Sequence, residues 1–134
     1  MVIWKEASSE IIELTKMIID EYHPRLRTAR IGVITRSEAP SMNGKVTLGK
    51  CKKISKELQL HVPYDFLVWI ALDEWERLST RQQEALIDHE LSHAGWDGTQ
   101  ASIIGHDIEE FDHILKRWGF WWPSSDRTIM AVQY

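Results

Sequence analysis

Five consecutive residues, His89-Glu90-Leu91-Ser92-His93, constrain this chain more than any other stretch. Two residues four positions apart lie one above the other on the same helix face, so both imidazoles can reach a single ion. Glu90 lies about 100° further round the helix, too far to join the pair as a ligand but close to a water on that ion. The motif therefore predicts a helix that presents a metal site. The alternative is an amphipathic helix with two solvated histidines.

The flanking residues indicate where this helix begins and ends. Ser79-Thr80 can cap it, with Gln82 or Gln83 completing a capping box, so the motif is expected about two turns after the start. Gly95 and Gly98 are expected to end the helix and open a loop.

The residue types in the motif favour zinc chemistry. Imidazole is a common zinc ligand, and catalytic zinc sites combine three protein ligands with one open position. A water held there has its pKa lowered to about 7. Glu90 is the candidate general base that takes the proton and passes it to the leaving amine. HExxH on a helix is typical of metallopeptidases.

A third ligand has to come from elsewhere, and the residues after the loop offer several. We expect His106-Asp107 to open a last helix that ends at Gly119. His106 is the favoured ligand because it can point along the gap between the two helices. The alternatives on this helix are Glu109, Glu110 and His113. The apolar stripe of the helix comprises Ile108, Phe111, Leu115 and Trp118.

The rest of the chain predicts an α+β fold. Helical periodicity covers residues 8–22, and β-branched or alternating apolar residues predict strands at 30–36 and 45–51. A continuous apolar run at 66–72 predicts a buried strand. The sheet thus has three strands, or four if a terminal strand at 128–132 joins it. An Asn-Gly turn signal precedes the second strand.

Several other side chains have both a structural and a functional interpretation. The basic cluster Lys50, Lys52, Lys53 and Lys56 is interpreted as a charged strand edge, with substrate binding as the alternative. His23 and His61 lack ligand spacing and are expected to be structural or solvated. A core role is favoured over a groove-lining role for Trp96, Trp121 and Trp122.

Composition limits the class of protein. At 134 residues, the chain is expected to form one domain, residues 1–134. The single cysteine, Cys51, allows no internal disulfide. A net charge of -4 argues against nucleic-acid binding. We find no apolar run of membrane-spanning length and no signal-like start, so a cytoplasmic protein is expected.

The segment His89–His93, followed by Gly105-His106-Asp107-Ile108-Glu109-Glu110-Phe111, resembles the zincin domain of the SprT-like metalloproteases. It is more similar still to small phage-encoded metallopeptidases, in which HExxH is followed by a His-Asp-x-x-Glu-Phe segment. Compared with SprT-like proteins, Asp107 replaces a glycine and Phe111 comes one residue later. The likeness extends over about residues 8–119, but only the two motifs are specific.

The resemblance implies that His89, His93 and His106 bind Zn²⁺ and that Glu90 is the general base. Asp107 or Glu109 is a candidate to orient a ligand imidazole. Candidates for an oxyanion-stabilising side chain are His113, Tyr64 and Tyr134. The DNA-linked substrates of eukaryotic SprT relatives are not carried over, because their nucleic-acid-binding tail has no counterpart here.

The sequence leaves three functional hypotheses. The first is a zinc-dependent metallopeptidase that acts on a peptide or protein substrate. The second is a catalytically silent zincin-fold binding protein, for example a phage protein that acts on a host factor, with the metal kept for stability. The third is a structural zinc site with all four positions filled, where the fourth ligand is Glu109, Glu110 or His113.

Overall fold

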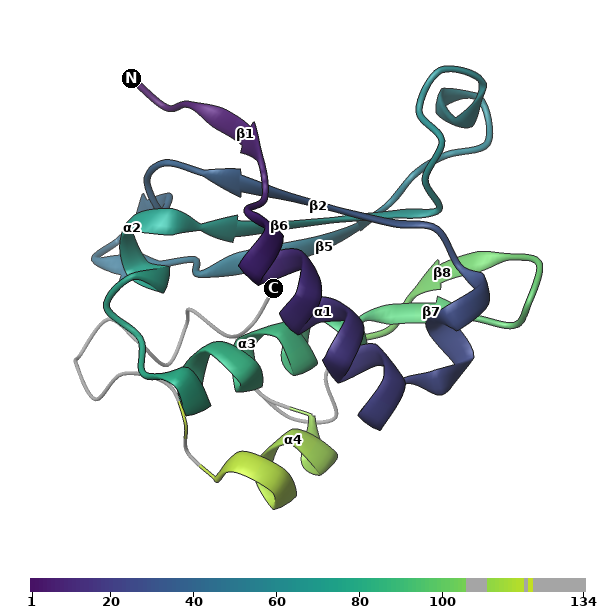
Figure 1. Cartoon of the computed structure of the whole chain (residues 1–134). Helices are drawn as coiled ribbons and strands as arrows, with labels where there is room; N and C mark the ends of the chain where they lie inside the picture. The colour runs from purple at the N-terminus through teal and green to yellow at the C-terminus, as the bar shows by residue number, and fades with distance from the viewer. Residues whose placement is uncertain (106–110, 120, 122–134) are drawn as a thin grey trace.

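A four-stranded mixed sheet lies above the helices in Figure 1. The computed structural model describes residues 1–105, 111–119 and 121. The strand order is β1-β2-β6-β5, with β2 parallel to β6 and the two outer strands antiparallel to their neighbours. The strands of this sheet are β1 (Trp4–Glu6), β2 (Ile31–Arg36), β5 (Gly49–Lys53) and β6 (Phe66–Ala71).

Three helices lie on one side of the sheet (Figure 1): α1 (Ser9–Tyr22), α3 (Thr80–Ser92) and α4 (Asp112–Trp118). Shorter helical turns are α2 (Leu72–Trp75), η1 (Pro24–Thr28) and η2 (Leu58–Leu60). Two small hairpins pair β3 (Ser41–Met42) with β4 (Lys45–Val46), and β7 (Ala94–Trp96) with β8 (Ala101–Ile103). The described residues thus form an α+β fold, as predicted, and none of their helices is long and apolar enough to cross a membrane.

The hydrophobic core lies between the sheet and the helices α1 and α3. Alternate residues of a strand point to opposite faces, so one face of β6 meets the helices. From that face the core receives Phe66, Val68 and Ile70. The helices supply Ile11, Ile18, Ala85, Leu86 and Leu91, each no more than 4 % exposed.

The predicted boundaries of the first helix and of two strands are close to the observed ones. Ser8 caps α1 by accepting a hydrogen bond from the Ile11 amide at 3.3 Å, and Pro24 opens the next turn. Strands predicted at 30–36 and 66–72 correspond to β2 and β6.

Other predictions differ from the structure in instructive ways. The single strand predicted at 45–51 is two strands, β4 and β5. The Asn43-Gly44 turn has φ of 54° and 76°, the left-handed pair that a two-residue hairpin turn requires, so β4 pairs back onto β3. The fourth strand of the sheet is β1, close to the N-terminus. The predicted strand 128–132 lies outside the described residues.

The region after the motif also differs from its prediction. The loop expected after Gly98 contains β8, and Gly95 lies within β7 instead of ending a helix. A side chain at position 95 would come within 2.3 Å of Ser102 Oγ on the paired strand, so close strand approach explains this glycine. The last helix begins at Asp112, after Phe111 in an extended conformation. Its predicted first residues, 106–110, lie outside the described residues.

Candidate metal centre

The helix that carries the motif has the predicted start. The Ser79 hydroxyl accepts a hydrogen bond from the Gln82 amide at 3.2 Å, and the Gln82 side chain accepts one from the Ser79 amide at 2.9 Å. This capping box satisfies two amide groups that a helix N-terminus otherwise leaves unpaired. The helix ends earlier than predicted, because His93 is its C-cap residue and the chain passes directly into β7.

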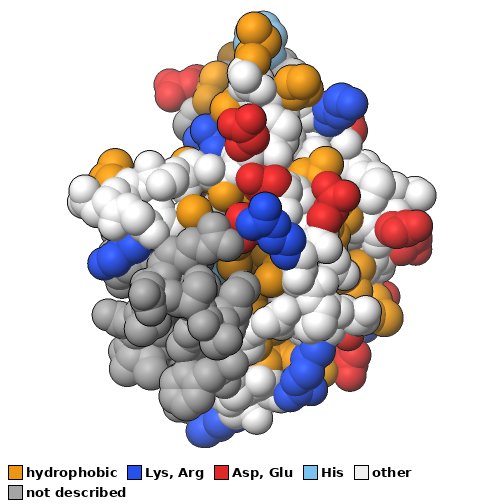
Figure 2. Space-filling view, turned by 90° about the vertical axis from the view of Figure 1, so that its left-hand side faces the viewer, with side chains coloured by type: hydrophobic (Ala, Val, Ile, Leu, Met, Phe, Trp, Pro, Cys, Tyr) orange, Lys and Arg blue, Asp and Glu red, His pale blue; other side chains and the backbone are white. Residues whose placement is uncertain are grey.

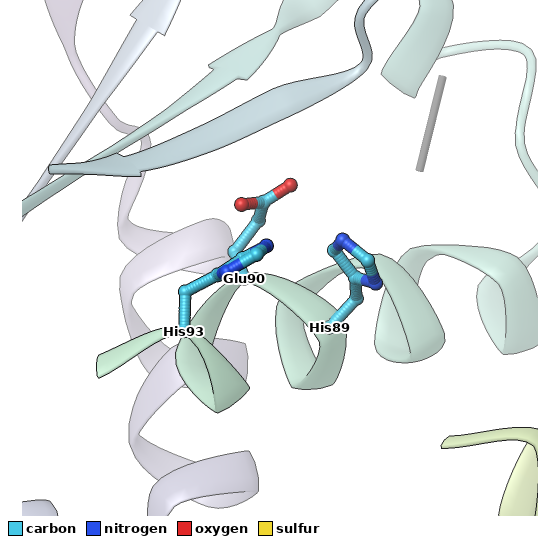
Figure 3. Close-up of side chains that lie close together, drawn as sticks. All are labelled: His89, Glu90 and His93. Carbon is cyan, nitrogen blue, oxygen red and sulfur yellow. The ribbon is translucent and has the colours of Figure 1, made fainter. Parts of the chain in front are cut away.

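The three polar residues of the motif meet in the protein interior. One ligand atom each from His89, Glu90 and His93 lies within 4.8 Å of the other two. His89 and Glu90 are 0 % exposed and His93 is 6 % exposed. Figure 3 shows that all three side chains leave α3 on the side that faces the sheet. The two imidazoles are of the ligand type that zinc sites use, and the Glu90 carboxylate lies within reach of an ion held between them.

A backbone carbonyl fixes which nitrogen of His93 can bind metal. The Nδ1 atom lies 2.7 Å from the carbonyl oxygen of Ile104. A carbonyl oxygen only accepts hydrogen bonds, so Nδ1 carries the proton and the lone pair is on Nε2. The Ile104 amide in turn donates to the His93 carbonyl at 2.7 Å. The stretch leading out of the β7–β8 hairpin therefore orients this imidazole, as partners of metal-binding histidines do. The donor set thus fits a metal ion.

Aromatic rings surround the two histidines. The His89 ring centroid lies 5.6 Å from that of Phe111 and 6.3 Å from that of Trp121, and the His93 ring is 5.1 Å from Phe111. Trp121 is 4 % exposed. Trp96 is half-buried, and its indole N–H donates to Thr28 Oγ1 at 2.8 Å. Both tryptophans thus have packing roles, as favoured from the sequence, while Trp122 lies outside the described residues.

Strand β5 closes the site on the side of Glu90. A Cβ atom at Gly49 would lie 3.3 Å from Glu90 Oε2 and 2.9 Å from the carbonyl oxygen of Trp69. Two residues further along, Cys51 is buried, and burial together with the Glu90 charge raises the pKa of its thiol. Only a residue without a side chain fits at position 49, so the strand can lie directly against the candidate base.

A buried polar network holds the other side of α3. Asp88, which precedes the first motif histidine, accepts hydrogen bonds from His23 Nε2 at 2.6 Å, Arg117 Nη1 at 2.5 Å and Trp118 Nε1 at 3.0 Å. Burial opposes ionisation of Asp88, but the hydrogen bonds from His23 and Trp118 outweigh it and place the pKa of this carboxyl below its ordinary value.

The same network reaches the far end of the motif. Arg25 Nη1 donates to His23 Nδ1 at 2.9 Å, and Arg25 Nη2 donates to the Ala94 carbonyl at 2.7 Å. Because the guanidinium only donates, His23 carries its proton on Nε2. A chain of hydrogen bonds therefore spans residues 88 to 94 and ties the motif to η1. His23 is structural, as expected, and His61 is exposed.

The remaining candidates from the sequence are not all described. His113 Nε2 lies 2.8 Å from Ser92 Oγ, and His113 is not in the cluster that the described residues form around the motif. The Tyr64 ring packs against Gly32, on the face of the sheet opposite to the helices. The candidates that lie outside the described residues are His106, Asp107, Glu109, Glu110 and Tyr134.

Comparison with known proteins agrees with this geometry. Residues 2–133 match the model of a family described as putative phage metallopeptidase. Searches of curated proteins and of solved structures each found no match. The His-Glu-His cluster and the family name together indicate a metal-binding protein, and the name implies peptide or protein substrates. With a match over nearly its whole length, the chain belongs to the putative phage metallopeptidase family.

Proposed function

We propose that this protein is a zinc-dependent peptidase of the minimal zincin type, formed by residues 1–134 as one domain. The observation that carries the proposal is the buried convergence of His89, Glu90 and His93 on the sheet-facing side of α3. His89 and His93 are the proposed zinc ligands, with His106 as the third. When bound, zinc supplies a Lewis acid and lowers the pKa of a water that it holds.

Each residue of the motif has a distinct role in the proposal. Glu90 takes a proton from the attacking water and returns it to the leaving amine, which requires a carboxylate within reach of the ligand atoms. The Ile104 carbonyl holds His93 in the tautomer that leaves Nε2 to the metal. Asp107 or Glu109 is proposed to orient a further ligand imidazole.

The sheet offers a place for the substrate. β5 is an outer strand of the sheet and lies against Glu90 through Gly49. An extended peptide can add to such an edge by backbone hydrogen bonds. In this arrangement the scissile bond passes close to the motif, with the substrate held by main-chain contacts.

The experiment compares cleavage of a fluorogenic peptide library by the zinc-loaded wild type and by Glu90→Gln. The variant is expected to retain its zinc and to lose at least about 100-fold in rate, the usual contribution of a general base. Glu84→Gln, on the same helix and half-buried, is the matched control and should cleave like the wild type. Equal cleavage by Glu90→Gln and wild type would refute the assignment of Glu90. No cleavage by the wild type would favour the catalytically silent binding protein.

A further inference from the structure

The segment around β5 is strongly basic in a chain that is acidic overall. Between residues 39 and 56 there is no aspartate or glutamate, while the whole chain has a net charge of -4. The lysine edge, as we name it, consists of the β5 residues Lys50, Lys52 and Lys53. All three are exposed, and none forms an ion pair with a carboxylate within the described part of the chain.

The lysine edge lies next to the candidate metal centre. Gly49 and Cys51, the neighbours of Lys50, are buried and lie close to the Glu90 carboxylate. Figure 3 shows that carboxylate pointing toward the sheet. A peptide that runs along the outer side of β5 therefore passes the motif and the lysine edge together.

The pleat of the strand determines what a bound peptide would meet. Lys50 and Lys52 pair with Trp69 and Leu67 of β6, on the face of the sheet away from α3, whereas Cys51 points toward the core. Side chains of an added strand alternate in the same way, so every second one would lie about 4.5–5.5 Å from a lysine, measured between Cβ atoms. Opposite charges at such positions stabilise strand pairing, and like charges destabilise it.

Protection against edge-to-edge aggregation is a second role for lysines on an outer strand. The opposite edge strand, β1, is also exposed but carries both Lys5 and Glu6. On the face shown in Figure 2, acidic and basic side chains also lie next to one another. Of the two outer strands of the described sheet, β5 is thus the one whose charged side chains all have the same sign. The acidic net charge of the chain disfavours nucleic acid as the ligand, whereas a strand edge is suited to an extended peptide.

We propose that the lysine edge selects acidic extended segments of substrate protein, with Asp or Glu side chains opposite Lys50 and Lys52. The proposal rests on the proposed function, because it deepens the substrate class of the same site. Two favourable cross-strand pairs correspond to a preference of about two- to thirty-fold for an acidic peptide over an otherwise identical neutral one.

The test separates recognition from cleavage. Binding of labelled ten-residue peptides to the zinc-loaded Glu90→Gln protein is measured by fluorescence anisotropy, with acidic, neutral or basic residues at alternate positions. The acidic peptide should bind most tightly, and its advantage should shrink with added salt. In the Lys50→Glu/Lys52→Glu variant the basic peptide should bind most tightly. A control with the same change in net charge, Lys5→Glu/Lys16→Glu, alters exposed lysines on β1 and α1 and should keep the acidic preference.

Equal binding of the three peptides, or a preference unchanged by the double reversal on β5, would overturn the proposal. Tighter binding of a single-stranded DNA oligonucleotide than of the acidic peptide would also overturn it. With the wild type, kcat/KM for the three peptides should follow the same order. Acidic preference in binding without any cleavage would refute the peptidase function but support acidic recognition, so the two proposals fail separately.

Discussion

Removal of the Asp88 carboxylate should destabilise the protein far more than removal of an exposed carboxylate. Asp88 is 0 % exposed and accepts three hydrogen bonds, from His23, Arg117 and Trp118. In the Asp88→Ala variant, the His23 N–H group stays buried without its acceptor, and the Arg117 guanidinium loses its counter-charge. Truncating one partner of a buried charged network costs about 3–5 kcal/mol. For a domain of this size, the Tm should fall by about 9–15 °C.

Urea and thermal unfolding, followed by circular dichroism, provide the measurement. Both proteins are first treated with chelator, so that a difference in metal binding does not enter the comparison. The matched control is Asp20→Ala, which breaks an ion pair with Arg27 whose side chains are 65 % and 56 % exposed. The control should lose less than about 1 kcal/mol. If Asp88→Ala lowered the free energy of unfolding no more than Asp20→Ala, the network would not hold α3 in place.

Three further predictions follow from individual contacts. The Gly49→Ala substitution should lower the free energy of unfolding by about 1–3 kcal/mol, because the added Cβ would overlap the neighbouring strand. The variant should retain zinc, while its cleavage rate falls up to about 100-fold because Glu90 is displaced. An unchanged cleavage rate would contradict this contact. Burial alone would raise the pKa of Asp65, but hydrogen bonds from Arg30 outweigh it, and the pKa is lower than the ordinary value. The ionised Asp65 therefore stabilises the fold above about pH 4, and this stabilisation is lost as the pH falls through the pKa of the folded state. The acid limb of a stability–pH curve should therefore be shallower in Asp65→Asn, and an identical limb would count against the assignment. Ser79→Ala should cost about 1 kcal/mol in urea unfolding through loss of the capping box, and no loss would show that the cap is dispensable.

The elements that were predicted well have local causes. The start of α3 is set by Ser79 and Gln82, two residues three positions apart whose side chains each accept a hydrogen bond from the other's backbone amide. Strand β6 is a continuous apolar run. Lys50, Lys52 and Lys53 lie on an outer strand of the sheet, the position that the alternating pattern of this segment predicted. The placement of His89 beside His93 follows from helix geometry alone, whereas the approach of the Glu90 carboxylate to both imidazoles does not.

The parts that were missed depend on contacts between distant residues. Asp88 and His23 are 65 positions apart, and no periodicity relates them. The only local signal was an aspartate directly before the motif. The β7–β8 hairpin was missed because Gly95 was interpreted as a helix stop, whereas it is required by the close approach of Ser102. The contact of Gly49 with Glu90 similarly joins a strand to a helix that comes much later in the chain.

The most direct test of the central claim is the zinc content of the protein, purified without a histidine tag and supplied with zinc. The measurement is made by mass spectrometry of the metal, on the wild type, His89→Ala and His93→Ala. The control is His61→Ala, which changes an exposed histidine outside the motif. The account predicts about one zinc per chain in the wild type and in the control, and its loss in both motif variants. A wild type that binds no zinc, or a zinc content that survives both motif substitutions, would contradict it.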